Sequence, residues 1–230
     1  MAGDERKMIN TIIFDMDGVI IDSITIQFQI WKDLMKKHDV ELSDEFLDKV
    51  NGMNTPEIAR RIVNEFALDV DAAELAKEKR MLSGEKVKEG IPMFEGVKEN
   101  LSVLKKLGYK IGLATMSPRK HVEYALGKNL FDLEFDAIVT DDDVQNPKPS
   151  PEIFLKCAQE LKSEPEECVV VEDAINGIEA ARAAGMYAIA VTTTTGKKYF
   201  TKAHAIMQKT SELNSDLINA LSTKVEEKNV

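Results

Sequence analysis

The stretch Thr11-Ile12-Ile13-Phe14-Asp15-Met16-Asp17-Gly18 lies near the start of the chain and sets the first expectation about the fold. Its four leading residues have the length and branching of a buried strand. If the chain turns at Gly18, Asp15 and Asp17 can face one pocket at the carboxyl edge of a sheet, where open α/β folds bind ligands. The alternative is a solvated strand end, in which both acids point into water.

Further strand signals follow along the chain. Four short apolar runs have the same character, at residues 110–114, 137–140, 168–172 and 187–191. Helical patterns lie between most of them, at residues 97–107, 119–127, 151–161 and 174–184. Alternation of this kind predicts a Rossmann-like, doubly wound parallel sheet with helices on both faces, an α/β fold.

One connection is much longer than the others. Apolar residues recur at helical spacing within it, at residues 24–38, 44–50, 56–66 and 71–89, and Pro56 suits the first turn of a helix after Asn54 and Thr55. We therefore expect an α-helical cap domain at residues 23–90, inserted into an α/β core domain at residues 8–22 and 91–230.

The composition excludes several classes of protein. Of the 230 residues, 43% are hydrophobic and 30% are charged, as in soluble globular proteins. No apolar run could cross a membrane and the start of the chain does not resemble a signal peptide, so we expect a cytoplasmic protein without a membrane partner. The net charge of −10 argues against a nucleic acid as partner. Cys157 and Cys168 predict neither a disulfide framework nor a zinc site.

Two loops after the predicted strands carry groups that could bind an anion. In Thr115-Met116-Ser117-Pro118, hydroxyls and backbone amides precede a helix and suit phosphate oxygens. In Pro147-Lys148-Pro149, the prolines stiffen the loop and predict a fixed ammonium group. The alternatives are helix capping by Thr115 or Ser117 and an ordinary solvated lysine.

The strand at 168–172 ends in a second pair of acids, Glu172 and Asp173. Carboxylates are hard oxygen ligands of the kind that Mg²⁺ takes. Gathered with Asp15 and Asp17 in one pocket, they would repel one another unless a cation were present, so a metal requirement is expected. The alternative is a helix N-cap by Asp173.

All four groups of polar residues fall at the carboxyl ends of predicted strands or in the loops that follow them. In this combination and order, the sequence resembles the haloacid dehalogenase superfamily from about residue 11 to residue 191. The resemblance is to the branch with a helical cap, which includes β-phosphoglucomutase and many sugar-phosphate phosphatases.

The resemblance implies a role for each core residue. Asp15 would be the nucleophile that becomes phosphorylated, and Asp17 the general acid and base. Thr115, with Met116 beside it, would bind the transferring phosphoryl group, and Lys148 would neutralise its charge. Mg²⁺ would be held by the carboxylates of Asp15 and Asp173 and the backbone carbonyl of Asp17, while Glu172 would order the metal's water ligands.

The resemblance also assigns residues of the cap. Gly52 matches the glycine of a substrate-specificity loop, and Lys79 matches a lysine that contacts the far end of the substrate, although a lysine in so charged a helix could also be solvated. Thr55 and Gln27 stand where the mutase has an arginine and a histidine. These two departures favour a hydrolase over a phosphomutase.

The sequence therefore predicts a Mg²⁺-dependent phosphohydrolase acting on a small phosphorylated metabolite, present as a monomer or small homo-oligomer. A phosphomutase of the β-phosphoglucomutase type is the alternative within the family. A dehalogenase is disfavoured, since it has no oxygen leaving group for Asp17 to protonate. A non-catalytic phosphate- or partner-binding module is the alternative of another class, and the intact acids argue against it.

Overall fold

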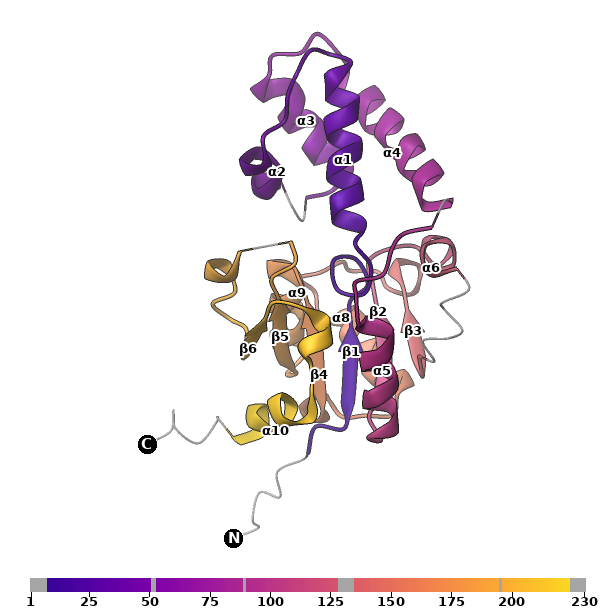
Figure 1. Cartoon of the computed structure of the whole chain (residues 1–230), viewed down its shortest axis with the longest axis vertical. Helices are drawn as coiled ribbons and strands as arrows, with labels where there is room; N and C mark the ends of the chain where they lie inside the picture. Colours follow the sequence, from indigo (N-terminus) through magenta and orange to yellow (C-terminus); the bar gives the residue numbers. More distant parts are fainter. Residues whose placement is uncertain (1–7, 51–52, 89, 128–134, 195, 224–230) are drawn as a thin grey trace.

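The computed structural model describes residues 8–50, 53–88, 90–127, 135–194 and 196–223. The chain forms two lobes, one of helices and one built around a parallel sheet (Figure 1). No helix among the described residues is long and apolar enough to cross a membrane. Cys157 and Cys168 are buried free thiols.

The sheet confirms the predicted fold class. It consists of the strands β1 (Thr11–Phe14), β2 (Lys110–Ala114), β3 (Ala137–Val139), β4 (Cys168–Glu172), β5 (Tyr187–Val191) and β6 (Ala205–Met207). Their order is β3-β2-β1-β4-β5-β6, and every neighbouring pair is parallel. The first strand therefore lies inside the sheet between β2 and β4, where the strand order reverses.

Two details differ from the expectation. The strand β3 ends one residue early, because the backbone N–H and hydroxyl of Thr140 both donate to the Asp143 carboxylate, at 2.9 and 2.8 Å, and turn the chain. The short edge strand β6 was not predicted at all. It has three residues, two of them only half-buried, so it lacks the apolar run that marks the interior strands.

Helices cover both faces of the sheet. On one face lie α5 (Val97–Lys106), α6 (Arg119–Leu126) and α10 (Ser215–Thr223), and on the other lie α8 (Glu152–Glu160) and α9 (Ile175–Ala183). Side chains of β1 alternate between the two layers, since Ile12 and Phe14 pack on the first face and Ile13 on the second. Short 3₁₀ helices complete this lobe: η1 (Asp141–Asp143), η2 (Pro165–Glu167), η3 (Lys197–Tyr199) and η4 (Thr210–Glu212).

The long connection after β1 is helical, as predicted. It contains α1 (Ser23–Lys36), α2 (Asp44–Val50), α3 (Thr55–Glu65) and α4 (Ala72–Lys88), which share a separate apolar core around Trp31, Leu34 and Ile62. The start of α3 is fixed by a capping box between Asn54 and Glu57, with a proline in the first turn. The domain boundaries drawn at residues 23 and 90 stay a prediction.

The chain passes between the lobes twice, and the two passages lie side by side. The backbone N–H of Asp22 donates to Pro92 O at 2.9 Å, and that of Phe94 donates to Ile20 O at 3.0 Å. Ile21 forms an antiparallel bridge with Met93 between them. This paired connection fixes the helical lobe above the carboxyl edge of the sheet (Figure 1).

The packing of α8 against the sheet leads to a stability prediction. A Cβ placed on Gly112 of β2 would lie 2.6 Å from Cys157 Sγ and 2.9 Å from a Leu161 methyl. Gly112→Ala should therefore overpack this layer and lower the free energy of unfolding by about 1–3 kcal/mol in urea titrations. Adding Cys157→Ala to that variant should recover part of the loss.

Gly84 in α4 provides the matched control, because a Cβ there would meet no atom within 4 Å. Gly84→Ala should raise the free energy of unfolding by about 0.5–1 kcal/mol, since alanine is the better helix former. Equal effects of the two exchanges would contradict the proposed steric cause.

Candidate active site

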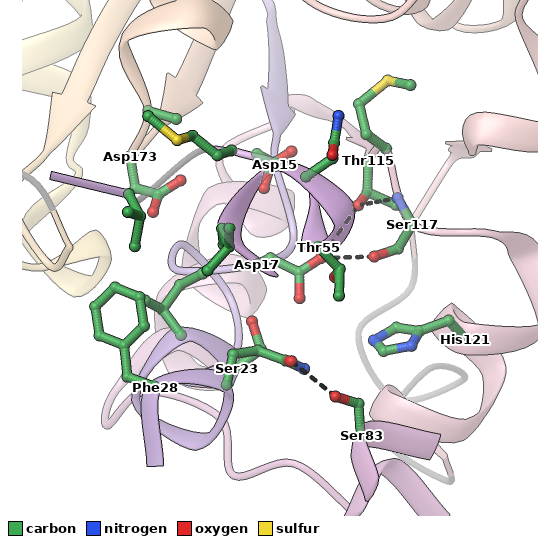
Figure 2. Close-up of a pocket in the computed structure, with 18 of the residues that line it drawn as sticks. Asp15, Asp17, Ser23, Phe28, Thr55, Ser83, Thr115, Ser117, His121 and Asp173 are labelled. Carbon is green, nitrogen blue, oxygen red and sulfur yellow. Dashed lines mark hydrogen bonds between the residues drawn. The ribbon is translucent and has the colours of Figure 1, made fainter. Parts of the chain in front are cut away.

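A cavity of about 660 Å³ opens where the carboxyl edge of the sheet meets the helical lobe. Its walls come from the loops after β1, β2 and β4 and from helices α1, α3 and α4 (Figure 2). The strand register explains why these loops meet. Phe14 pairs with both Leu113 and Val171, so the residues that follow the three strands emerge at one level.

The loop after β1 brings two carboxylates to this cavity. Asp15 continues the sheet by one hydrogen bond, from its N–H to Val171 O at 3.0 Å, and its side chain is buried. The chain then turns sharply at Gly18, which has a φ of +78° and donates its N–H to Ile21 O at 2.9 Å. Because of this turn, Asp17 lines the same cavity (Figure 2), and the solvated strand end is wrong for Asp15.

Lys148 joins the ends of two strands. Its Nζ lies 2.6 Å from Asp15 Oδ1 and 2.9 Å from Glu172 Oε1, and its side chain is only 4% exposed. The ammonium also lies 4.7 Å from the centre of the Phe154 ring. Burial lowers the pKa of Lys148, but the two carboxylates more than offset it, so the pKa is well above its ordinary value. The alternative of a solvated lysine is wrong.

The two acids at the end of β4 have different partners. Glu172 accepts a hydrogen bond from Ala174 N at 2.6 Å, and Asp173 accepts one from the Thr194 hydroxyl. Helix α9 begins after Ala174, which makes no side-chain cap. The alternative reading of Asp173 as a helix cap is therefore wrong, and its carboxylate is directed toward the loop after β5.

Asp15, Glu172 and Asp173 form a compact acidic cluster, with one oxygen from each within 4.8 Å of the others. Burial is the main cause that raises the pKa of Asp15, to about 7, with Lys148 opposing it and Glu172 adding to it. Burial and then repulsion by Glu172 and Asp15 raise the pKa of Asp173 well above its ordinary range. Clustered oxygen donors of this kind could hold a hard divalent cation.

The loop after β2 contributes hydroxyl groups. Ser117 Oγ donates to Asp17 Oδ2 at 2.8 Å, and the Thr115 hydroxyl lies 3.5 Å from the same oxygen (Figure 2). Ser117 N donates to Thr115 Oγ1 at 3.1 Å. Helix α6 begins after Pro118 without a side-chain cap, so the capping alternative for Thr115 and Ser117 is wrong. Met116 also lines the cavity.

The opposite wall of the cavity belongs to the helical lobe. Lys79 is only 6% exposed, and its ammonium donates to the side-chain oxygen of Gln27 and lies 5.7 Å from the centre of the Trp31 ring. Burial lowers the pKa of Lys79 to about 8. Lys79 is therefore not a solvated lysine. Thr55 lines the same cavity, whereas Gly52 lies outside the described residues.

Several lining residues were not predicted as part of the site. They include Ser23, Trp31, Arg80, Ser83 and His121. None of them lies beside a strand end or in a recognisable motif. The spacing of apolar residues in a helix identifies its apolar face, but not the part of the protein against which that face packs. Ser117 was noted in the sequence only as part of the phosphate-binding loop.

Comparisons with known proteins agree with this geometry. A family model described as haloacid dehalogenase-like hydrolase matches residues 12–191. The fructose-1-phosphate phosphatase YqaB of Escherichia coli (strain K12) is 35% identical over 185 residues, which cover 78% of this chain and 95% of that protein. Hexitol phosphatase B of the same strain is 31% identical over 206 residues, which cover 80% of this chain and 84% of that protein.

A solved structure is similar over nearly the whole length. β-Phosphoglucomutase from Clostridium difficile has a TM-score of 0.72 and 26% identity, and the match covers 95% of this chain and 99% of that one. The arrangement of sheet and helical lobe is thus shared with a mutase, while the sequence is similar to named phosphatases.

The raised pKa of Asp15 leads to a prediction about pH and stability. The folded protein holds this proton up to about pH 7, whereas the ordinary pKa is 3.8. The Asp15 carboxyl therefore makes its full contribution to the free energy of unfolding below pH 3.8. This contribution is lost as the pH rises to about 7. In EDTA, the free energy of unfolding should fall between pH 5 and pH 8, and it should fall by at least about 1 kcal/mol less in Asp15→Asn than in the wild type. The size follows because one pKa unit corresponds to about 1.4 kcal/mol.

Urea titrations at both pH values measure the effect. Asn keeps the volume of the side chain and removes the titration, so an identical pH dependence in the wild type and the variant would contradict the assignment.

Proposed function

The chain belongs to the haloacid dehalogenase-like hydrolase family and is related to its phosphatases, and from that premise we propose that it hydrolyses small phosphorylated carbohydrates through an aspartyl-phosphate at Asp15. The observation that carries the proposal is the pairing of a buried carboxylate with a buried ammonium, Asp15 with Lys148 at 2.6 Å, at the floor of a cavity. A nucleophile and a counter-charge for phosphoryl oxygens would then stand side by side.

The acidic cluster fits Mg²⁺ as the cofactor. The carboxylates of Asp15 and Asp173 and the backbone carbonyl of Asp17 would hold the ion, with Glu172 acting through water. When bound, it supplies positive charge that neutralises the phosphoryl oxygens during transfer. The fit rests on the ligand set, because carboxylate oxygens of three buried residues lie within 4.8 Å of one another. Within the described part of the chain, one buried ammonium, that of Lys148, is paired with two of these residues, Asp15 and Glu172.

The first half of the reaction uses Asp15 and Asp17. A carboxylate oxygen of Asp15 attacks phosphorus, and the bond from phosphorus to the ester oxygen breaks. Asp17 gives a proton to that oxygen as it leaves. The hydroxyls of Ser117 and Thr115 position the Asp17 carboxylate. The Lys148 ammonium stabilises negative charge on Asp15 and on the phosphoryl group during transfer.

The second half regenerates the enzyme. Asp17, now ionised, takes a proton from a water molecule, whose oxygen attacks phosphorus. The bond from phosphorus to Asp15 breaks and inorganic phosphate leaves. Asp17 is protonated again for the next cycle, so one carboxyl group serves as acid and then as base.

The cap wall supports a hydrolase over a mutase. Retaining a bisphosphate intermediate requires a strong second anion site, for which an arginine fork is well suited. Thr55 offers one hydroxyl at the position of the mutase arginine. Gln27, at the position of the mutase histidine, accepts hydrogen bonds from Lys79 and Ser83 and cannot take up a proton near neutral pH.

We predict that Asp15→Asn abolishes release of phosphate from p-nitrophenyl phosphate, because an amide is a poor nucleophile. Asp17→Asn should slow the same reaction by about 10²-fold to 10⁴-fold, the usual contribution of acid–base catalysis. Wild-type activity should require Mg²⁺ and vanish in EDTA. Circular dichroism of both variants serves as the control for folding. Substantial turnover by Asp15→Asn would overturn the mechanism.

A second prediction separates hydrolase from mutase. With β-glucose 1-phosphate, a trace of glucose 1,6-bisphosphate and Mg²⁺, free phosphate should appear faster than glucose 6-phosphate. The reason is that the wall around Thr55 lacks the charged fork that would keep the bisphosphate in place. The reverse order of appearance would make the protein a phosphomutase.

A further inference from the structure

The cavity extends beyond the proposed phosphate site. Part of its wall there consists of residues to which neither the sequence motifs nor the family match gives a role. His121, on core helix α6, and Ser83, on cap helix α4, face each other across it (Figure 2). We propose that these two residues form a subsite for the hydroxyl groups of the substrate's leaving group, so that the preferred substrate is a phosphate ester of a sugar or polyol. This rests on the proposed phosphatase function.

The position of His121 follows from the phosphate-binding loop. It lies four residues after Ser117, and its backbone N–H donates to Pro118 O at 2.8 Å in the first turn of α6. From there the imidazole points into the cavity (Figure 2). The ring is half-buried, and no hydrogen bond or ion pair joins it to another side chain among the residues that the structure describes. An imidazole offers one donor and one acceptor, which can both serve a ligand.

Ser83 is poised to pair with the same ligand. Its hydroxyl lies 3.0 Å from Gln27 Oε1 and 2.9 Å from Lys79 O, and one hydroxyl hydrogen can serve only one of these acceptors at a time. The lone pairs of the oxygen remain available. Since α4 contacts α6 directly, the two side chains belong to a continuous wall although they come from different lobes.

The chemistry of this wall favours a neutral, hydroxylated tail. The ring nitrogens of His121 and the hydroxyls of Ser83 and Thr55 are hydrogen-bonding groups that match hydroxyl groups of a ligand. One of the three N–H donors of Lys79 serves Gln27, and the others can also donate to a ligand hydroxyl. Arg80, which also lines the cavity, is exposed. The apolar part of the wall, from Trp31, Phe28 and Ile58, suits the C–H face of a sugar.

The experiment compares substrates with and without hydroxyl groups. Steady-state rates with Mg²⁺ are measured for p-nitrophenyl phosphate and for fructose 1-phosphate, sorbitol 6-phosphate and fructose 1,6-bisphosphate. Of fructose 1-phosphate and sorbitol 6-phosphate, one will be the better substrate of the wild type. His121→Ala should lower kcat/KM for that substrate about ten-fold or more, mainly by raising KM, as expected for one or two lost hydrogen bonds. The value for p-nitrophenyl phosphate should stay within about two-fold.

Matched variants sharpen the comparison. His121→Gln keeps one donor and one acceptor and should recover part of the loss. Ser83→Ala should act in the same direction, and the double variant should lose less than the product of the two single losses. Lys120→Ala serves as the control, because Lys120 is exposed on the same helix.

Three results would overturn the subsite: an equal loss on p-nitrophenyl phosphate, no loss on any substrate, or a loss confined to the bisphosphate, which would indicate an anionic tail. Failure of the proposed function is detected separately, by calorimetric binding of fructose 1-phosphate and sorbitol 6-phosphate to Asp15→Asn with and without His121→Ala. His121-dependent binding to Asp15→Asn, together with no turnover of either substrate by the wild type, would uphold the subsite and reject the phosphatase. Binding that is absent or independent of His121 would reject the subsite.

Discussion

The buried contact of Lys148 with Asp15 and Glu172 is the interaction on which the rest of the site depends. An ammonium removed from water is costly unless it is paired, and two carboxylates from different strands supply the pairing. In return, the lysine allows both carboxylates to remain close together in a buried position. The loop that carries Lys148 thereby ties the ends of β1 and β4, two neighbouring strands far apart in the sequence.

The sheet converts this local requirement into a working geometry. Since β1 lies between β2 and β4 in register, Asp15, the loop with Thr115 and Ser117, and the acidic cluster emerge at one edge. These groups are all held by the core, whereas the opposite wall of the cavity belongs to the cap. Under the proposed function, reaction type and substrate choice fall to different parts of the chain, and His121 is a core residue on the side of substrate choice.

The sequence allowed the interior strands and the residues after them to be predicted because a buried strand leaves a continuous apolar run. It did not reveal β6, which is short and half-exposed. Capping and metal binding cannot be told apart in a string such as Glu172-Asp173, and the cap is excluded because α9 begins after Ala174 and Asp173 accepts from Thr194. The burial of Lys79 likewise excludes the alternative of a solvated lysine, which the sequence had left open. No local sequence pattern marks His121 and Ser83, because they are brought together only when helices α4 and α6 pack against each other.

Gly18 and Gly177 show how closely the carboxylates fill the space around them. A Cβ on Gly18 would lie 2.1 Å from Asp173 Oδ2, and one on Gly177 would lie 1.8 Å from Glu172 Oε1. The acids therefore occupy the volume that any other side chain would need. Variation is thereby limited by shape at Gly177, and by shape and the positive φ at Gly18. A survey of tolerated exchanges would rank these two chemically inert residues beside Asp15.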